Sequence, residues 1–260
     1  METKKLFVCD LDGVLVRENG QVRNEDIKEI QEFIAAGGDF VICTGRLDQD
    51  IQYIEEKIGV KGKFRISQNG AVIKNKNDEI VFHKTINQKY VSTINDILSK
   101  YDVRTEINDS NNRYFPTPRA PEDIAEFIDT SIVKENLFEY SKENLDPTIY
   151  LNFGTNKEFK GIKEEIKEVL GDKVTVTQTS KTSLEIFSNE ASKGKAVNYI
   201  AKEMGFKKEN IFVAGDAESD VTMFPYAGLT FAVSEGASDF IISEADHHVL
   251  TVEDLLTKYL

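Results

Sequence analysis

The sequence predicts an α/β fold: a doubly wound, Rossmann-like parallel sheet with an inserted α+β domain. Near both ends of the chain, short continuous apolar runs alternate with amphipathic segments of helical length, and this alternation stops in the middle. Such runs are typical of strands buried on both faces of a parallel sheet, and their alternation with helices indicates βαβ units. In addition, Asp, Thr and Gly follow several runs directly, at the sheet edge where open α/β folds bind ligands.

The amino-terminal part begins with the apolar run 6–9, which we interpret as the first strand. Isoleucines at helical spacing then predict a helix that has Asn24 as its N-cap. A second apolar strand covers 40–43, and the next helix is stopped by Gly59. A third strand at 64–67 completes the first strand–helix repeats of the sheet.

The middle of the chain has a different pattern. Apolar segments at 71–73 and 80–82 flank a polar turn, which predicts a hairpin rather than a crossover. Beyond it, helical and alternating patterns are mixed, and a proline-containing polar loop follows the first helix. The elements expected here are a helix over 91–98, a strand over 148–153, a helix over 162–170 and antiparallel strands over 174–177 and 183–187.

The α/β alternation returns from Ser192 onward, with a helix through Val197, Ile200 and Met204 and a strand over 211–214. A further strand at 229–233 and a helix over 252–260 close the chain. We therefore expect one domain built from both ends of the chain and one inserted domain. The predicted boundaries are 1–82 with 188–260 for the α/β core, and 83–187 for the α+β cap.

The composition excludes several classes of protein. The 260 residues include 32 Lys and Arg against 45 Asp and Glu, a net charge of −13, which argues against binding of duplex nucleic acid. No apolar run approaches the roughly 18 residues of a membrane span, and residues 1–5 lack the features of a signal peptide. We expect a cytoplasmic protein without nucleic-acid or membrane partners; the sequence carries no signal for its oligomeric state. Cys9 and Cys43 form neither a disulfide framework nor a four-ligand zinc site, and we expect both in the core.

Four polar clusters stand at strand ends or at a helix start. A single Asp after a strand is most often a helix cap or a loop residue. Four clusters at one edge of a sheet, in contrast, favour a shared ligand site. They are Asp10-Leu11-Asp12-Gly13, Thr44-Gly45-Arg46, Ser192-Lys193-Gly194 and the segment from Gly215-Asp216 to Asp220.

These clusters carry a resemblance to a known family. Asp10-Leu11-Asp12-Gly13-Val14-Leu15 resembles the first motif of the haloacid dehalogenase-like hydrolase superfamily, and Thr44, Lys193 and Gly215-Asp216…Asp220 are similar to its second, third and fourth motifs. The long interval between Thr44 and Lys193 resembles a C2 cap. Asn69 to Ile73 and Ala245-Asp246 are similar to the Cof-type sugar phosphatases of that group.

The resemblance implies a role for each matched residue. Asp10 would attack phosphorus and form an aspartyl-phosphate, and Asp12 would act as general acid and base. Thr44 and Lys193 would hold phosphoryl oxygens, with further phosphate contacts from Leu11, Gly45, Arg46 and Ser219; Ser219 departs from the Asn usual at that position. Mg²⁺ would be bound by Asp10, the backbone oxygen of Asp12 and Asp216, with Asp220 supporting through water or Lys193.

Charge arithmetic independently favours a metal. Two carboxylates ~4 Å apart repel by about 4 kcal/mol at an effective dielectric of 20, and a phosphate dianion adds to this repulsion. Carboxylate oxygens without nearby His or thiolate ligands suit Mg²⁺. The sequence thus predicts a Mg²⁺-dependent phosphatase for small phosphorylated metabolites, especially sugar phosphates.

Two alternatives stay open: a phosphotransferase or phosphomutase on the same scaffold, and a catalytically silent sensor of phosphorylated ligands. The cap would close over the site, exclude water and supply selectivity. Its candidates for substrate recognition are Arg113, Tyr114, Arg119 and Tyr150, each of which is more often an ordinary surface residue.

Overall fold

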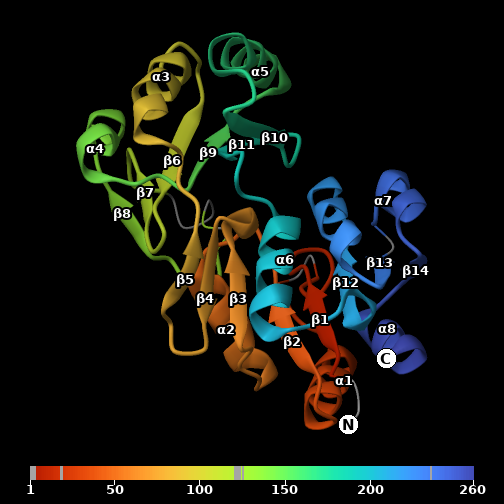
Figure 1. Cartoon of the computed structure of the whole chain (residues 1–260). Helices are drawn as coiled ribbons and strands as arrows, with labels where there is room; N and C mark the ends of the chain where they lie inside the picture. Colours follow the sequence, from red (N-terminus) through yellow and green to blue (C-terminus); the bar gives the residue numbers. More distant parts are fainter. Residues whose placement is uncertain (1–3, 18–19, 120–123, 125, 235) are drawn as a thin grey trace. The chain divides into compact units, whose positions relative to one another are not determined.

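The computed structural model describes residues 4–17, 20–119, 124, 126–234 and 236–260 (Figure 1). Residues 1–3, part of the segment compared above with a signal peptide, lie outside the described residues. The chain divides into two compact units, residues up to 82 with 192–260, and residues 83–191. The second boundary follows β11 (Ser183–Ser188), whose ladder with the preceding strand runs to its last residue.

The first unit is built on a parallel sheet with the strand order β14-β13-β12-β1-β2 among the described residues. Every pair in it is parallel, and every residue of β1, β2 and β12 is buried. The continuous apolar runs in the sequence follow from this two-sided burial. The strands are β1 (Leu6–Cys9), β2 (Asp39–Ile42), β12 (Ile211–Gly215), β13 (Leu229–Val233) and β14 (His247–Val249).

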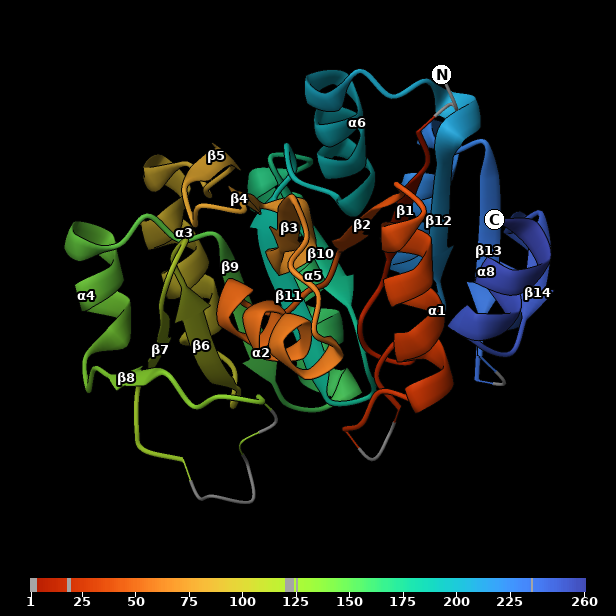
Figure 2. The same cartoon turned by 90° about the horizontal axis from the view of Figure 1, so that it is seen from below.

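Helices cover both faces of this sheet (Figure 2). On one face, α6 (Lys193–Met204) packs its apolar residues against Leu6 and Val8. On the other, α1 (Asn24–Ala35) and α8 (Val252–Tyr259) lie together, and Phe33 of α1 meets Phe7 edge-on, 6.3 Å between ring centroids. The doubly wound architecture is therefore confirmed.

No helix within the described ranges has the length and apolarity to cross a membrane. The remaining helices of this unit are α2 (Asp48–Ile58), α7 (Asp239–Glu244) and the 3₁₀ segments η3 (Lys208–Asn210) and η4 (Glu218–Tyr226).

The third predicted strand differs from expectation in its pairing. β3 (Phe64–Ser67) pairs antiparallel with β4 (Val72–Asn75), and with β5 (Ile80–His83) they form a separate three-stranded sheet. It is linked to the segment after β2 by a bridge between Cys43 and Ile66 and by the hydrogen bond that the Thr44 N–H donates to the Ile66 carbonyl at 3.0 Å. The cause is η1 (Gln68–Gly70), where positive φ angles reverse the chain at once, so that no crossover helix follows β3.

The predicted helix end at Gly59 is confirmed, and the predicted cap at Asn24 is wrong. Gly59 ends α2 with a φ of +65°. Asn24 is the first residue of α1, and Arg23 stands at the cap position without a side-chain hydrogen bond to the helix start. The Ser192 hydroxyl, for which no cap was predicted, caps α6 by accepting the Lys195 N–H at 3.1 Å.

The second unit is an α+β domain, as expected. Its sheet has the order β10-β11-β9-β6-β7-β8 within the described part of the chain. Among the described residues its neighbouring strands pair antiparallel except β7 with β8, and helices α3 and α5 pack on one face. The elements are α3 (Gln88–Leu98), β6 (Arg104–Asn108), β7 (Arg113–Phe115), β8 (Ser131–Val133), α4 (Leu137–Asn144), β9 (Ile149–Phe153), α5 (Asn156–Leu170), β10 (Val174–Gln178) and β11.

A buried ionic cluster supports the first unit beneath β3 and β4. The Arg65 side chain is fully buried, and its Nε donates to Asp48 Oδ1 at 2.7 Å. Lys74 Nζ lies 3.3 Å from the same carboxylate, and Arg65 Nη1 lies 3.5 Å from Glu55. Burial raises the pKa of Glu55 from 4.5 to about 7, although the Gly62 N–H and Arg65 favour the ionised form.

Glu55→Gln is expected to change how stability depends on pH. In the native protein Glu55 holds its proton more tightly in the folded than in the unfolded chain. The free energy of unfolding therefore falls as pH rises from about 4.5 to about 7, with a contribution on the order of 2 kcal/mol from this group. Gln keeps an oxygen for the Gly62 N–H and removes this slope. Urea unfolding at pH 5 and pH 8 measures the change.

Glu56→Gln, at the exposed neighbouring position, is the matched control and should keep the native slope. If both variants follow the native pH dependence, Glu55 is not the group that loses its proton in this window.

Candidate active site

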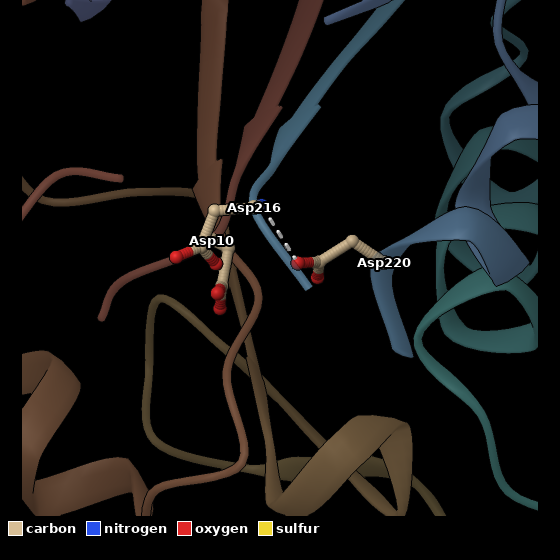
Figure 3. A group of neighbouring side chains, drawn as sticks. All are labelled: Asp10, Asp216 and Asp220. Atoms are coloured by element: carbon tan, nitrogen blue, oxygen red, sulfur yellow. Dashed lines mark hydrogen bonds between the residues drawn. The ribbon is translucent and has the colours of Figure 1, made fainter. Parts of the chain in front are cut away.

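Asp10 stands at the carboxyl end of β1, next to the neighbouring strand β12. Its N–H donates to the Ala214 carbonyl of β12 at 2.9 Å, which ties the residue to the sheet edge. Its side chain is buried (5% exposed). The backbone therefore fixes the place of this carboxylate, and Figure 3 shows it beside Asp216.

Asp216 and Asp220 complete a group of three carboxylates. Asp216 follows the end of β12, and Asp220 lies fully buried in η4. Asp220 Oδ2 accepts the Asp216 N–H at 3.1 Å (Figure 3). It also accepts the Ala217 N–H at 3.1 Å. A Cβ on Gly215 would lie 2.2 Å from the Asp220 Cβ, so only glycine allows this approach. One oxygen from each of the three carboxylates lies within 4.8 Å of the others.

Lys193 joins two of these carboxylates. It is the first residue of α6, its side chain is 4% exposed, and its Nζ donates to Asp10 Oδ1 at 2.8 Å and to Asp220 Oδ1 at 2.7 Å. The next residue, Gly194, holds the helix start against η4, since its N–H donates to Thr222 Oγ1 and a Cβ would lie 1.7 Å from the Thr222 carbonyl oxygen. Close backbone packing thus aims the lysine between the two aspartates.

The cluster carries more negative than positive charge. Burial, together with Asp220 and Asp216, holds the pKa of Asp10 well above its ordinary value against the opposing effect of Lys193. Burial and Asp220 raise the pKa of Asp216 to about 7. Burial alone lowers the pKa of Lys193, but Asp10 and Asp220 outweigh it and raise that pKa well above its usual value. One ammonium therefore does not balance three carboxylates.

The donor set fits Mg²⁺. It consists of hard carboxylate oxygens, and the pKa values of Asp10 and Asp216 are raised in the way that missing positive charge produces. The loop after β1 is fitted closely to this group, because Gly13 has a φ of +80° and a Cβ there would lie 2.0 Å from Asp216 Oδ2. Any residue other than glycine would force Asp216 out of place.

Asp12 lies outside the three-carboxylate group and pairs with Arg46. Arg46 Nε and Nη2 donate to its two oxygens at 2.7 and 2.8 Å. The Asp12 side chain is 50% exposed, against 23% for Arg46. Burial lowers the pKa of Arg46, but Asp12 more than compensates and raises it. Arg46, expected to contact phosphate, is here the residue that orients Asp12.

Thr44 lies at the end of β2 and is buried. Its N–H donates to the Ile66 carbonyl at 3.0 Å, and its hydroxyl oxygen accepts the Arg46 N–H at 3.2 Å.

Asn69 was not among the predicted site residues, yet its N–H donates to the Thr44 carbonyl, and a Cβ on Gly45 would lie 3.0 Å from its Oδ1. The Asn69-Gly70 pair, where both φ angles are positive, is the sequence signal that marks this turn.

Leu11 and Ser219 are the other predicted phosphate contacts. The Leu11 side chain is fully buried, so its backbone N–H is the group available for a ligand. Ser219 is partly exposed in η4, and its carbonyl accepts the Thr222 hydroxyl at 2.8 Å. The phosphate-binding roles of both residues stay predictions.

The four cap candidates are not surface residues. Tyr150 is fully buried and donates to Asn95 Oδ1 at 3.0 Å, while Tyr114 donates to Asp109 Oδ2 at 2.9 Å. Both belong to the core under α3 and α5, because alternate residues of β7 and β9 face the helices. Arg113 and Arg119 are also buried, and both form ion pairs with Glu126.

Comparisons with known proteins agree on one family. A family model described as haloacid dehalogenase-like hydrolase matches residues 7–254. The putative phosphatase YxeH of Bacillus subtilis is 26% identical over 247 residues, covering 91% of this chain and 90% of that protein. The 5-amino-6-(5-phospho-D-ribitylamino)uracil phosphatase YcsE of the same organism is 26% identical over 257 residues, covering 98% and 93%.

Solved structures with this fold cover nearly the whole chain. TM0651 from Thermotoga maritima superposes with a TM-score of 0.83 at 26% identity and covers 99% of this chain and 98% of its own. The subclass IIB sugar phosphatase BT4131 has a TM-score of 0.80 over 96% of this chain and 95% of its own. At 19% identity, the second likeness shows the fold alone.

Lys193→Met is expected to destabilise the protein by about 3–5 kcal/mol without divalent cations, because it leaves buried carboxylates uncompensated. Adding Asp10→Asn to this variant removes one of those charges and should recover part of the loss. Denaturant unfolding in EDTA measures both changes.

Lys195→Met is the control, since this lysine is exposed two residues further along α6 and should change stability by no more than about 0.5 kcal/mol. Equal stability of the two single variants would contradict the balancing role of Lys193.

Proposed function

This chain belongs to the haloacid dehalogenase-like hydrolase family, and from that premise we propose that it hydrolyses phosphate monoesters of small metabolites, with Asp10 as nucleophile and Mg²⁺ as cofactor. The family match and the relatives named as phosphatases confirm the predicted superfamily, its Cof-type branch and the phosphatase class. The similar solved structures confirm the fold class. Sugar phosphates are the substrates we propose, on the Cof-type resemblance of the sequence.

One observation carries the proposal. A buried lysine donates to Asp10 and Asp220, and Asp216 lies within reach of both carboxylates. Hydrolysis of phosphate monoesters is very slow without a catalyst, and enzymes accelerate it by positioning the reactants and stabilising charge on the phosphoryl oxygens. A nucleophilic carboxylate beside a fixed ammonium serves both purposes.

Asp10 is the residue we assign to attack. One of its oxygens forms a bond to phosphorus, the bond from phosphorus to the ester oxygen breaks, and the alkoxide leaves with both electrons of that bond. Lys193, whose Nζ lies 2.8 Å from Asp10 Oδ1, supplies positive charge to the phosphoryl oxygens. Water then attacks the aspartyl-phosphate and restores the free carboxylate.

Asp12 is the residue we assign to proton transfer. Its side chain is half exposed, so it can reach a leaving alkoxide, to which it gives a proton; it later takes one from the attacking water. Arg46 holds both of its oxygens in the ligand-free site. We infer that the incoming phosphate competes for Arg46 and so frees Asp12 for this task.

Asp10, Asp216 and the backbone oxygen of Asp12 are the ligands we propose for Mg²⁺, with Asp220 acting through Lys193. When bound, the cation supplies the positive charge that the cluster lacks and allows a phosphate dianion to approach. The chain's own contribution is to hold Asp10 and Asp216 side by side through the pairing of β1 with β12.

The test is phosphate release from a broad panel of phosphate monoesters. The native chain with Mg²⁺ should release inorganic phosphate into water, and EDTA should abolish the release. Asp10→Asn should lower turnover by at least ~10³-fold because the nucleophile is lost. Asp239→Asn, at an exposed position of α7 in the same unit, is the control and should keep native turnover.

Turnover that survives Asp10→Asn would contradict the assignment of the nucleophile. Release of no phosphate from any ester of the panel would contradict the phosphatase itself. Transfer of the phosphoryl group to an alcohol, without free phosphate, would favour a phosphotransferase.

A further inference from the structure

The sheet of the second unit has a polar face opposite its helices. Ile107 and Tyr114 point into the helix-covered core, so their neighbours along β6 and β7 point the other way. Together with Arg119, which follows β7, these neighbours form what we call the arginine face. It comprises Arg104, Glu106, Asn108, Arg113, Phe115 and Arg119.

Several polar atoms of the arginine face are buried without a hydrogen bond. Among the described residues, no hydrogen-bond partner is present for Arg104 Nε and Nη2, Asn108 Oδ1 or Arg119 Nε. Asn108 is 3% exposed, and the Arg119 side chain is 4% exposed. Buried polar groups are nearly always paired, and a concentration of unpaired ones on one surface indicates a site for a polar ligand.

The edge of a guanidinium that carries Nε and Nη2 can donate two parallel hydrogen bonds to one carboxylate. The chain uses this edge twice in its first unit: Arg46 holds Asp12 at 2.7 and 2.8 Å, and Arg65 holds Asp48 at 2.7 and 3.3 Å. The same edge of Arg104 has no such partner among the described residues.

Glu106 does not fill that edge. Its Oε1 lies 3.8 Å from Arg104 Nη2, beyond hydrogen-bond length. Glu106 is itself 4% exposed, and burial raises its pKa to about 7, although Arg113, Arg119 and Arg104 oppose the shift. A carboxyl that is partly protonated near neutral pH repels an incoming anion less than a fully ionised one.

Phe115 and neighbouring acids hold two of the guanidiniums in place. The ring centroid of Phe115 lies 3.9 Å from the Arg119 guanidinium carbon and 5.2 Å from that of Arg104. Arg119 Nη1 donates to Glu126 at 2.8 Å and its Nη2 to Asp129 at 3.1 Å, which leaves Nε for another partner. Both arginines are thus stacked on one ring before any ligand arrives.

We propose that Arg104 and Arg119, stacked on Phe115, form a binding site for a small oxyanion, a carboxylate or a phosphate group. The site goes beyond the proposed function and shares no residue with the Asp10 cluster. The three guanidiniums of the arginine face are opposed by the carboxylates of Glu126 and Asp129, and Glu185 of β11 lies on the same face of the sheet. An anion is therefore recognised through hydrogen bonds from the guanidinium edges and not through net charge. The oxyanion is the carboxylate or phosphate group of a small metabolite.

Binding is tested by calorimetry with malonate on the full-length chain, without divalent cations. We expect one malonate per chain in the native protein and an affinity at least tenfold weaker in Arg104→Gln. Arg104→Lys keeps the positive charge but cannot donate two parallel hydrogen bonds, and this variant should also bind malonate several-fold more weakly. The control is Lys100→Gln, which removes one positive charge at an exposed position of the same unit and should keep native affinity.

Thermal unfolding of each variant confirms that it is folded, and Arg104→Lys serves as the decisive variant if Arg104→Gln does not fold. Absence of malonate binding in the native chain would overturn the proposal. So would equal affinity in the native chain and the Arg104 variants.

The experiment keeps the two proposals apart. Failure of the chain to hydrolyse any phosphate ester counts against the proposed function, while the calorimetric result still decides the oxyanion site.

Discussion

The ammonium of Lys193, buried between Asp10 and Asp220, is the interaction on which the rest of the site depends. Burying charges is costly, and a buried pair offsets that cost only with close geometry and further hydrogen bonds. The fold meets this condition: β1 and β12 are neighbours in the sheet, so Asp10 and Asp216 leave it side by side, and α6 begins opposite them. Residues 183 positions apart in the sequence thereby share one hydrogen bond.

Glycines at three positions allow this approach. At Gly13, Gly194 and Gly215 a Cβ would lie at most 2.2 Å from a neighbouring atom, too close for any other residue. In each case that neighbour belongs to Asp216, Asp220 or the η4 backbone. The close packing therefore brings three carboxylates together without balancing their charge. Such local destabilisation is expected at a functional site.

The sequence was informative where periodicity and strand ends determine position. Apolar runs followed by Asp10, Thr44 and Asp216 predicted the edge of the sheet at which these residues lie. Side-chain pairing could not be predicted from the sequence, since the ion pair between Arg46 and Asp12 depends on side-chain rotamers and not on residue spacing. Strands β6 and β7 were missed because one face carries charged residues in place of the polar and apolar alternation that marks a strand. For the same reason the burial of Tyr114 and Arg119 could not be foreseen.

The central claim is that three carboxylates around one lysine require a divalent cation, and calorimetry of Mg²⁺ binding tests it most directly. The native chain should bind one Mg²⁺, and Asp216→Asn should weaken that binding at least tenfold because a carboxylate ligand is lost. Glu218→Gln, two residues away and exposed, should bind as the native chain does. Equal affinity in the native chain and Asp216→Asn, or no binding by the native chain, would contradict the account.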